Sequence, residues 1–520
     1  MKQKLFSKIV ALLLLVSLLL IGTTSCGESA TSSKAPTSSS TPTSGTPSQS
    51  EKEPADLYPT QLESLKGKTD GSTVSFIYVD GSGGYTAKSI FVNPEDGDID
   101  DVGSGIIERN NKIYANYGIT IDPIHASSVG IDGLQDYTKT MFDTQDNTID
   151  VYCGYQYFDI SLATQKHLYN LHELTNDEGD EIIDISKEYW ATNYINSITY
   201  DDYLYWVTGD LTLRYTGGLY CTYVNTEIYD EKVRAAYDGK SIYEIVNEGQ
   251  WFTTTMLDMI KLGANDFDGS GSITDGEIAG FYYQNNDIWD GLAFGCKVEF
   301  GKKVKNPNGS EEISITLGTD TKAASFASFC SSLYDSPYTL GVEGMDSVAQ
   351  MEAFANGEAL FVVNQIYQSP IYLSDMESFA IIPTPKLNKD QKYYASGCHD
   401  SLTIYGISRY SDVPQAAAVT LELMAYYGHT LVAPVFYESY ILGGRTVRED
   451  ESIEMINLIR KGFDSDFVAA WSNRIANIVH TFRTPSNCKS FKTYTRNMAT
   501  RWPSNLNKLI EELEKASIVE

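Results

Sequence analysis

Strands alternate with amphipathic helices in the first part of the folded region, and this alternation restricts the chain to an α/β fold. Residues 72–85 (STVSFIYVDGSGGY) predict a strand that ends in a glycine turn. Residues 102–118 have helical spacing, with Ile113 and Tyr114 among the apolar residues on one side. Residues 147–155 then predict a buried strand. This order predicts a sheet with helices on both faces.

The folded region is too long for one hydrophobic core. It runs from Tyr58 to Glu520, whereas single cores stop growing at about 250–300 residues. Its later part also mixes the two element types. Residues 347–368 predict a helix, an Asn-Gly break and a strand, and residues 414–428 predict a helix with Pro in its first turn and Gly after its last. Two or more α/β lobes are therefore expected.

The first 25 residues have the pattern of a secretion signal. Three lysines precede an apolar run at residues 9–22, which is too short to span a bilayer and suits a signal peptide. The run leads to Cys26, an arrangement that resembles a bacterial lipoprotein signal in which this cysteine is lipidated. Residues 23–25 (TTS) depart from the usual pattern, so an ordinary secretory signal with a free cysteine stays open. Either way, we expect the rest of the chain outside the cytoplasm.

A tether follows the signal. Residues 26–57 are rich in Ser, Thr and Pro and have almost no large apolar side chain, so burial cannot offset the entropy lost on ordering. We expect a flexible connection of about 30 Å on average. A lipidated Cys26 at its start would hold the folded region on the extracellular face of the cell membrane.

Composition excludes several classes of function. The net charge of −30 argues against nucleic acid and against adhesion to anionic lipid, since both need a basic surface. The sequence has no CxxC pair and no HExxH motif, which argues against the common zinc sites. Six cysteines remain after Cys26, and disulfides and free thiols are both compatible with their number.

Several segments in a fixed order resemble one protein family. They are WFTTTMLDMI at residues 251–260, FANGEALF at 354–361, FAIIPTPK at 379–386, LTIYGISR at 402–409 and the helix start DVPQAAA at 412–418. With the lipoprotein-like head, this order resembles the extracellular solute-binding proteins of ABC importers, specifically the carbohydrate-binding lipoproteins of Gram-positive bacteria. The resemblance covers residues 72–515.

The resemblance implies a two-lobed α/β fold of the type II periplasmic-binding-protein kind, with a hinge and an interlobe cleft. Lobe 1 is expected at residues 58–205 plus 400–455, and lobe 2 at 206–399 plus 456–520. The chain would cross between lobes near residues 206–210, return near 396–402, and cross again before the C-terminal helices. Ligand binding in the cleft would close the lobes, and the permease subunits of the importer would recognise the closed form. We expect a monomer and no enzymatic activity.

Sugar capture needs flat rings for the apolar faces of a pyranose and polar groups for its hydroxyls. Candidates are side chains at the ends of predicted strands and at the crossings, although core packing is an alternative for each. The predicted ligand-binding residues are Tyr155, Tyr157, Trp206, Asp210, Trp289, Gln365, Tyr367, Asp400 and Arg445.

Residues 266–277 (DFDGSGSITDGE) match the twelve-residue calcium loop. Gly271 stands at the sixth position, where the loop turns sharply, and the spacing suits a hard cation that needs six or seven oxygens. A docking module would need two such loops, and a signalling EF-hand a second long helix where the resemblance places a strand. We therefore expect a structural Ca²⁺. The predicted ligands are Asp266, Asp268, Ser270, Ser272, Thr274 and Glu277.

Two other functions remain open from the sequence. A surface sugar-binding protein without an importer, serving adhesion or sensing, would have the same cleft. A secreted carbohydrate-active enzyme would need a pair of carboxylates across the cleft, and no carboxylate stands in a recognisable catalytic motif.

Overall fold

The computed structural model describes residues 57–80, 85–342, 347–376, 378–441 and 449–517. The predicted signal peptide, Cys26 and Arg445 lie outside the described residues. Within these ranges, no helix combines the length and the apolar character that crossing a bilayer requires. The six cysteines found there are free thiols, and all but Cys398 are buried.

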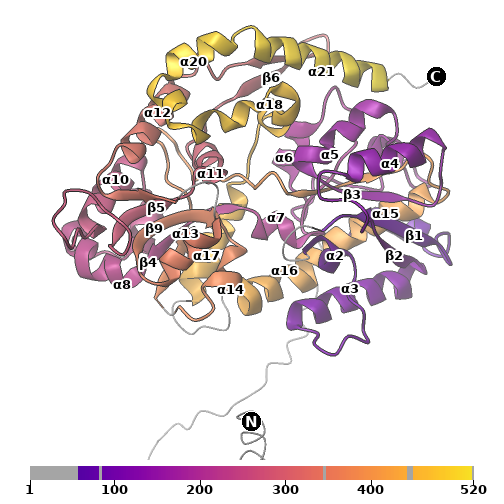
Figure 1. Ribbon diagram of the computed structural model, residues 1–520. Coiled ribbons are helices and arrows are strands. Elements are labelled where there is room, and N and C mark those ends of the chain that lie inside the picture. Colours follow the sequence, from indigo (N-terminus) through magenta and orange to yellow (C-terminus); the bar gives the residue numbers. More distant parts are fainter. Residues whose placement is uncertain (1–56, 81–84, 343–346, 377, 442–448, 518–520) are drawn as a thin grey trace, which may run out of the picture. The chain divides into compact units, whose positions relative to one another are not determined.

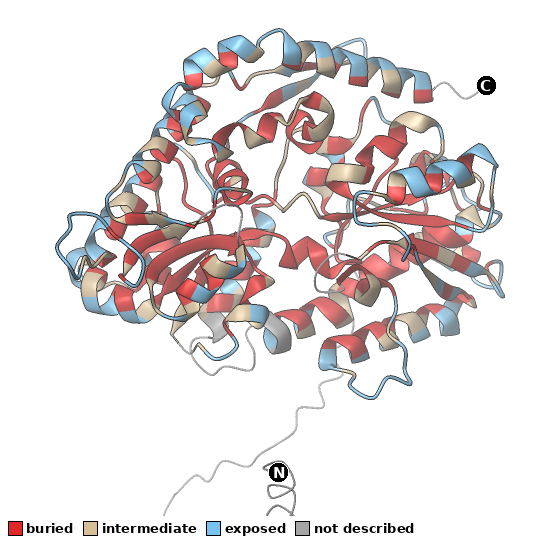
Figure 2. Cartoon of the chain, viewed as in Figure 1, coloured by how far each residue is buried: buried red, intermediate tan, exposed pale blue. Residues whose placement is uncertain are grey.

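The first sheet has the strand order β11-β3-β1-β2. Strands β1 (Thr73–Tyr78), β2 (Thr120–His125) and β3 (Val151–Tyr155) are parallel, and β11 (Thr403–Ile407) runs antiparallel to β3. Every residue of β3 and β11 is buried, as expected for strands covered on both faces. Figure 2 shows these strands in the buried colour, with exposed residues on the surrounding helices and loops. We call the part built on this sheet the first lobe.

Helix α3 (Asp101–Tyr117) connects β1 to β2 and begins and ends at residues suited to those places. Asp100 accepts a hydrogen bond from the Gly103 N–H, and Gly118 ends the helix with φ of 64°. The sequence placed Tyr114 on the apolar face, and this was wrong. Tyr114 is 62% exposed, while Tyr117, one helical turn after Ile113, is buried in its place.

The second sheet has the order β10-β4-β9-β5-β8. Strand β5 (Ala279–Tyr283) is parallel to β8 (Thr339–Gly341) and to β9 (Ala359–Gln365). Strand β4 (Tyr220–Asn225) runs antiparallel to β9 and to β10 (Phe379–Ile382). We call the part built on this sheet the second lobe, and Figure 1 shows its strands β4, β5 and β9 at the left and the strands β1, β2 and β3 of the first lobe at the right.

The other elements pack around these sheets or connect them. The larger helices are α4 (Leu134–Asp143), α6 (Thr192–Ile198), α9 (Ile242–Asn247), α10 (Thr253–Gly263), α11 (Ile288–Gly295), α12 (Thr321–Tyr334), α13 (Ser347–Ala355), α15 (Pro414–Tyr427), α17 (Glu449–Lys461), α20 (Phe491–Met498) and α21 (Arg501–Ser517). The short elements include α2 (Tyr85–Ile90), α5 (Gln156–Asp159), η2 (Ile160–Gln165), α7 (Leu213–Gly217), α8 (Thr226–Ile228), α14 (Gln368–Tyr372), η6 (Gly428–Val432), α16 (Ala433–Val435), α18 (Phe467–Ala470), α19 (Pro485–Lys489) and the hairpin of β6 (Gly301–Lys305) and β7 (Glu311–Ile315).

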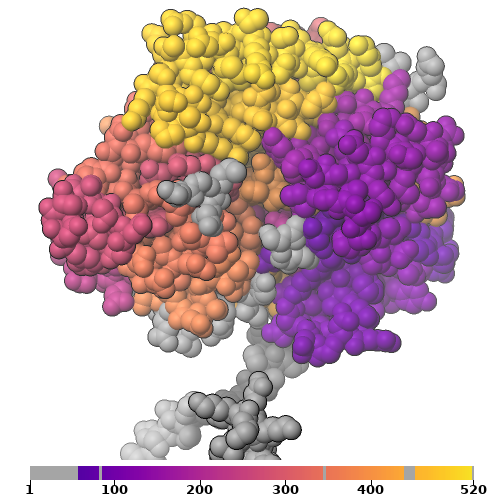
Figure 3. Space-filling model, viewed as in Figure 1, coloured from indigo at the N-terminus to yellow at the C-terminus, as the bar shows by residue number. Residues whose placement is uncertain are grey.

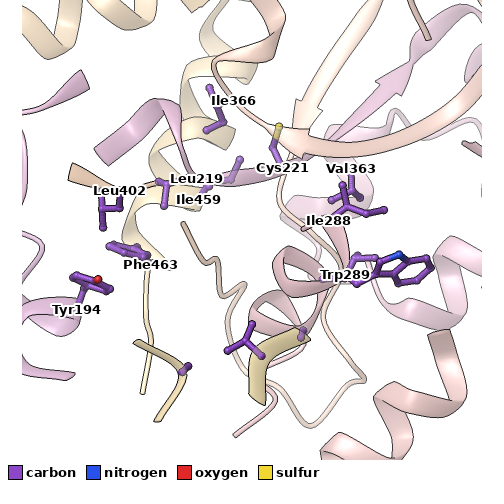
Figure 4. Close-up of a cluster of buried hydrophobic side chains, with 14 of the residues drawn as sticks. Tyr194, Leu219, Cys221, Ile288, Trp289, Val363, Ile366, Leu402, Ile459 and Phe463 are labelled. Atoms are coloured by element: carbon purple, nitrogen blue, oxygen red, sulfur yellow. The ribbon is translucent and has the colours of Figure 1, made fainter. Parts of the chain in front are cut away.

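Three segments pass between the lobes side by side. The Tyr220 N–H donates to the Gly397 carbonyl at 3.0 Å, and the Ser396 N–H donates to the Gly462 carbonyl at 2.9 Å. Figure 4 shows apolar side chains of these segments, among them Leu219 and Phe463, gathered in one cluster. The lobes are thus joined by three adjacent connections, an arrangement suited to a hinge.

The first crossing lies later in the chain than the sequence suggested. Val207 and Tyr405 exchange two backbone hydrogen bonds, of 3.0 and 2.9 Å, so residue 207 still belongs to the first sheet. The chain leaves that sheet afterwards, through α7, and enters the second sheet at Tyr220. The family resemblance located the crossing only approximately and did not predict that residue 207 pairs with β11.

The C-terminal segment contacts both lobes. Helix α17 packs against β10, and α19 packs against α12, both in the second lobe. Helix α21 packs against η2 of the first lobe. Figure 3 shows this segment, in yellow, extending across one side of both lobes.

Candidate functional site

A cavity lies between the lobes at the carboxyl end of β3. Its lining comes from residues that follow β3, from α11 and the start of β4, from the crossing at residues 397–400, and from residues 463–480. Both lobes and the C-terminal segment therefore build it. Its volume of about 40 Å³ accommodates a few water molecules. A bound solute of larger size would require the lobes to move apart.

Aromatic side chains form much of the cavity wall. The ring of Tyr157 stacks on His480 with the centroids 5.9 Å apart, and its hydroxyl donates to Asn477 Oδ1 at 3.0 Å. Tyr194 stacks on Phe463 at 5.2 Å. Burial, with a contribution from Arg483, lowers the pKa of His480 to about 4, so this imidazole is neutral at pH 7. The wall thus offers flat, uncharged surfaces.

Carboxylates provide the polar part of the wall. Asp290 accepts hydrogen bonds from Arg483, whose Nη1 also donates to Asn286 Oδ1 at 2.6 Å. Burial raises the pKa of Asp290 to about 7, against the opposing effect of Arg483. Asp400 lies 3.9 Å from the Arg483 guanidinium and 3.3 Å from His399 Nδ1, and its side chain is 34% exposed. Asp400 therefore keeps acceptor capacity for a ligand.

A second buried carboxylate, Asp287, lies beside this wall. Its Oδ2 accepts from the Tyr220 hydroxyl at 2.9 Å and from Gln365 Nε2 at 2.8 Å, and Gln284 donates to Oδ1. His399 Nε2 is 3.5 Å away. Asp287 thus holds side chains at the ends of β5 and β9 in place. The predicted ligand residue Gln365 is one of them, since it donates to Asp287.

Tyr155 and Tyr367 lie together with Arg214, a residue that the sequence did not single out. The Arg214 guanidinium lies over the rings of Tyr155 and Tyr367 at 5.5 and 5.4 Å, and over Tyr85 at 5.5 Å. Arg214 is on α7, in the crossing between the lobes. Its Nη1 donates to Ser401 Oγ at 3.1 Å, and this hydroxyl is 2.7 Å from His399 Nδ1. The tyrosine cluster and the cavity wall are therefore linked through hydrogen bonds.

Three predicted ligand residues lie elsewhere. Trp206 is buried in the first lobe, where its Nε1 donates to the Ile160 carbonyl at 3.2 Å. Trp289 is fully buried in the second lobe and stacks on Tyr334 with the centroids 4.2 Å apart. Asp210 accepts two hydrogen bonds from Arg460 Nη2, of 2.6 and 2.8 Å. These three side chains belong to packing and to an ion pair.

The structure also assigns cavity positions that sequence reasoning missed. Asp290 follows Trp289 directly, and a helix turns by about 100° per residue, so the two neighbours face different surroundings. His480, which lines the cavity, and Arg483, which pairs with Asp290, come from a part of the sequence near the C-terminus that has no periodic pattern. The one available signal was the charge of Asp290 beside Trp289, which the sequence predicted to bind the ligand.

The predicted calcium loop follows α10 and leads into β5. One carboxylate oxygen each of Asp266, Asp268 and Glu277 lies within 4.8 Å of the others. The N–H of Gly271, where φ is 93°, donates to Asp266 Oδ2 at 2.7 Å. The N–H of Thr274 donates to Glu277 Oε2 at 2.8 Å. An all-oxygen donor set on a tight glycine turn suits a hard divalent cation.

Comparisons with known proteins identify the fold. No protein-family model and no curated protein matches the sequence. Among solved structures, the sugar-binding protein MalE of Xanthomonas citri matches with a TM-score of 0.53 at 11% identity, over 85% of this chain and 98% of that chain. The GacH receptor of Streptomyces glaucescens, solved with acarbose, gives 0.50 at 12% identity, over 85% and 98%. A cyclo/maltodextrin-binding protein in complex with maltotetraose gives 0.50 at 13% identity, over 85% and 96%.

The chain has the two-lobed fold of the periplasmic binding proteins. The expectation of a two-lobed α/β fold is thereby confirmed. In open α/β sheets, ligands bind outside the carboxyl ends of the strands. The cavity adjoins the carboxyl end of β3, and the tyrosine cluster adjoins the carboxyl ends of β3 and β9, where that rule places a ligand.

Proposed function

We propose that this chain is an extracellular solute-binding protein that captures a carbohydrate between its lobes and delivers it to an ABC importer. The observation that carries the proposal is the interlobe wall of stacked rings and an under-partnered carboxylate, Asp400. The structural neighbours reported above support it, because they are a sugar-binding protein and proteins solved in complex with acarbose and maltotetraose.

The chemistry of this wall suits a sugar. Rings such as Tyr157 cover the apolar C–H faces of a pyranose, and Asp400 accepts hydrogen bonds from its hydroxyls. Opening at the three adjacent crossings admits the ligand, and closure around it buries both surfaces. Binding and release need no bond to be made or broken, so no catalytic role is proposed.

The lipid anchor and the location also belong to this proposal. A lipidated Cys26 and the tether at residues 26–57 would hold the two lobes on the outer face of the cell membrane, within reach of permease subunits. Replacing Cys26 by Ser is expected to release the protein into the medium. Retention of the Cys26→Ser variant in the membrane fraction would contradict lipid anchoring.

Thermal unfolding against a glycan panel tests the function. A cognate sugar at a hundred times its dissociation constant adds about 2.7 kcal/mol to the free energy of unfolding. Chromatography of the same samples checks that the sugar is recovered unchanged. The proposal fails if peptides or other solutes raise the melting temperature while no sugar does, or if the sugar is cleaved. Loss of uptake on deletion of the neighbouring permease genes would distinguish import from adhesion or sensing.

The loop at residues 266–277 is proposed as a structural Ca²⁺ site. Asp266, Asp268 and Glu277 would supply carboxylate oxygens, Ser270 and Thr274 would complete the set from side chains or through water, and Ser272 would offer its carbonyl. The ion would neutralise three neighbouring carboxylates and hold the connection between α10 and β5. This site lies on the second lobe and is proposed to have no ligand-contacting role.

A further inference from the structure

The strongest unexplained feature of the interlobe region is the charge on Arg214. This side chain is 4% exposed and has five N–H donors. Two hydrogen bonds involve the guanidinium, to Ser401 Oγ at 3.1 Å and to the Tyr155 hydroxyl at 3.5 Å. Its Nε has no hydrogen-bond partner among the described residues. The Tyr367 hydroxyl also interacts with the guanidinium, but no carboxylate of the described residues is within ion-pair distance of it, so its charge has no counter-charge there.

The tyrosine rings compensate this charge in part. Tyr85 and Tyr155 come from the first lobe and Tyr367 from the second, each with its ring centroid about 5.5 Å or less from the guanidinium carbon. A ring face attracts a cation, but it offers no strong acceptor to the N–H groups. Tyr367 is only half-buried, so the cluster borders the surface between the lobes.

Other arginines of low exposure in the described chain have the partners that Arg214 lacks. Arg460 is paired with Asp210, and Arg483 with Asp290. Arg109 donates to the Ile90 carbonyl at 2.8 Å. A buried cation without a carboxylate or a carbonyl is costly, because desolvation is not repaid. A cation of this kind in the crossing between the lobes therefore points to a partner supplied by the ligand.

The acidic side chains described above face other residues rather than Arg214. Asp287 accepts from Tyr220, Gln365 and Gln284, and Asp400 faces His399 and Arg483. Ser401 connects Arg214 to His399 without supplying a negative charge. An anion entering beside Arg214 would thus find an available guanidinium, while the carboxylate of Asp287 is held by its own donors.

We propose that Arg214 binds the carboxylate of an acidic sugar, so that the ligand contains a uronic acid unit. This rests on the carbohydrate-binding function proposed above. The planar guanidinium can hold a carboxylate through two parallel N–H bonds, with unpartnered Nε as one donor. Tyr155 and Tyr367 would then cover the faces of the same sugar ring from the two lobes, which couples recognition of the acid to closure.

The test compares acidic and neutral sugars of equal size. Glucuronate and galacturonate oligosaccharides, their methyl esters, and neutral gluco-oligosaccharides are titrated against wild type, Arg214→Met and Arg214→Lys by calorimetry. An acidic oligosaccharide is expected to bind wild type, and esterification is expected to weaken binding about thirtyfold or more, since it removes one partner of a buried charge pair. In Arg214→Met, acid and ester should bind equally. Arg214→Lys should retain part of the preference for the acid.

Arg234→Met removes an exposed arginine and serves as the control, which should keep the full preference for the acid. If Arg214→Met does not fold, the ratio of the affinities for the acid and for its methyl ester, measured in wild type and in Arg214→Lys, still tests the proposal. Neutral sugars that bind wild type at least as tightly as the acids overturn this proposal and leave the sugar-binding function standing. Absence of binding by every oligosaccharide overturns both.

Discussion

At the scale of single residues, neighbours in the sequence can have unrelated roles in the folded protein. Trp289 and Asp290 are adjacent, yet Trp289 stacks on Tyr334 in the core while Asp290 lines the cavity. Tyr157, in contrast to Trp289, lines the cavity, and its ring packs on His480. Both residues are aromatic candidates in the sequence, but substitution of Tyr157 is expected to affect ligand binding and substitution of Trp289 to affect stability.

Tyr157→Ala is expected to weaken sugar binding by about 0.5–1.5 kcal/mol, the contribution of one aromatic contact, with little change in the melting temperature. Trp289→Ala is expected to lower the free energy of unfolding by about 3–5 kcal/mol, because it leaves a cavity in the core, and to leave affinity unchanged. Calorimetry and denaturant unfolding measure the two quantities. The site assignment is wrong if the effects are exchanged.

His480 predicts a pH dependence of stability. Its pKa is about 4 in the folded chain and about 6.5 when unfolded. Between these values the unfolded state binds the extra proton, so this contribution is fully present above pH 6.5 and is lost as pH falls toward 4. Urea unfolding between pH 4 and 7 is therefore expected to vary less in His480→Gln than in wild type. Identical slopes in the two proteins would count against a buried neutral imidazole.

At the scale of elements, the loop between α10 and β5 acts as a unit. Backbone N–H groups donate to the Asp266 and Glu277 carboxylates, and these bonds depend on the glycine turn at Gly271. The twelve-residue pattern predicted which side chains converge, because the ligand spacing is local. The strand after the loop was also expected, and β5 is there.

Calcium is expected to raise the melting temperature, and chelation to reverse the effect. At a hundred times its dissociation constant the ion would add about 2.7 kcal/mol. Asp266→Ala should abolish the response to calcium, whereas Asp275→Ala, which changes an exposed carboxylate at a non-ligand position, should keep it. Sugar affinity should not change in either variant. Equal melting temperatures with calcium and with chelator would rule out the site.

At the scale of the whole described unit, a buried ion pair joins the lobes beside the crossings. Asp210 belongs to the first lobe, and Arg460 lies on α17, which packs against the second sheet. His429 Nδ1 adds a contact to Asp210 at 2.7 Å, and the Arg460 guanidinium lies over the rings of Tyr215 and Tyr437. The side chains of Asp210 and Arg460 are 3% and 13% exposed, so water cannot replace either partner.

Asp210→Asn is expected to lower the free energy of unfolding by about 3–5 kcal/mol, because it leaves Arg460 buried without its counter-charge. Asp230→Asn breaks the exposed pair with Arg234 and should cost less than about 1 kcal/mol. Urea unfolding of the two variants measures the difference. Equal losses would mean that the Asp210–Arg460 pair is solvated.

The sequence by itself determined the features that depend on residues close together along the chain. The alternation of strand and helix predicted the α/β elements, and the order of the segments from Trp251 to Ala418 predicted two lobes. The calcium pattern predicted three carboxylates that the structure brings together. These are short-range signals, since period, capping and ligand spacing act within about a dozen residues.

Only the tertiary structure decided which side chains meet between the lobes. Trp206, Asp210 and Trp289 satisfied the same local criteria as Tyr157 and Asp400, but packing buried the tryptophans and Arg460 engaged Asp210. Arg214 and Arg483 had no local signal, because their surroundings come from segments distant in the sequence, such as Tyr367 for Arg214 and Asp290 for Arg483. Contacts between segments that are distant in the sequence form the cleft. Which charged side chains pair there therefore depends on how these segments come together in the folded protein.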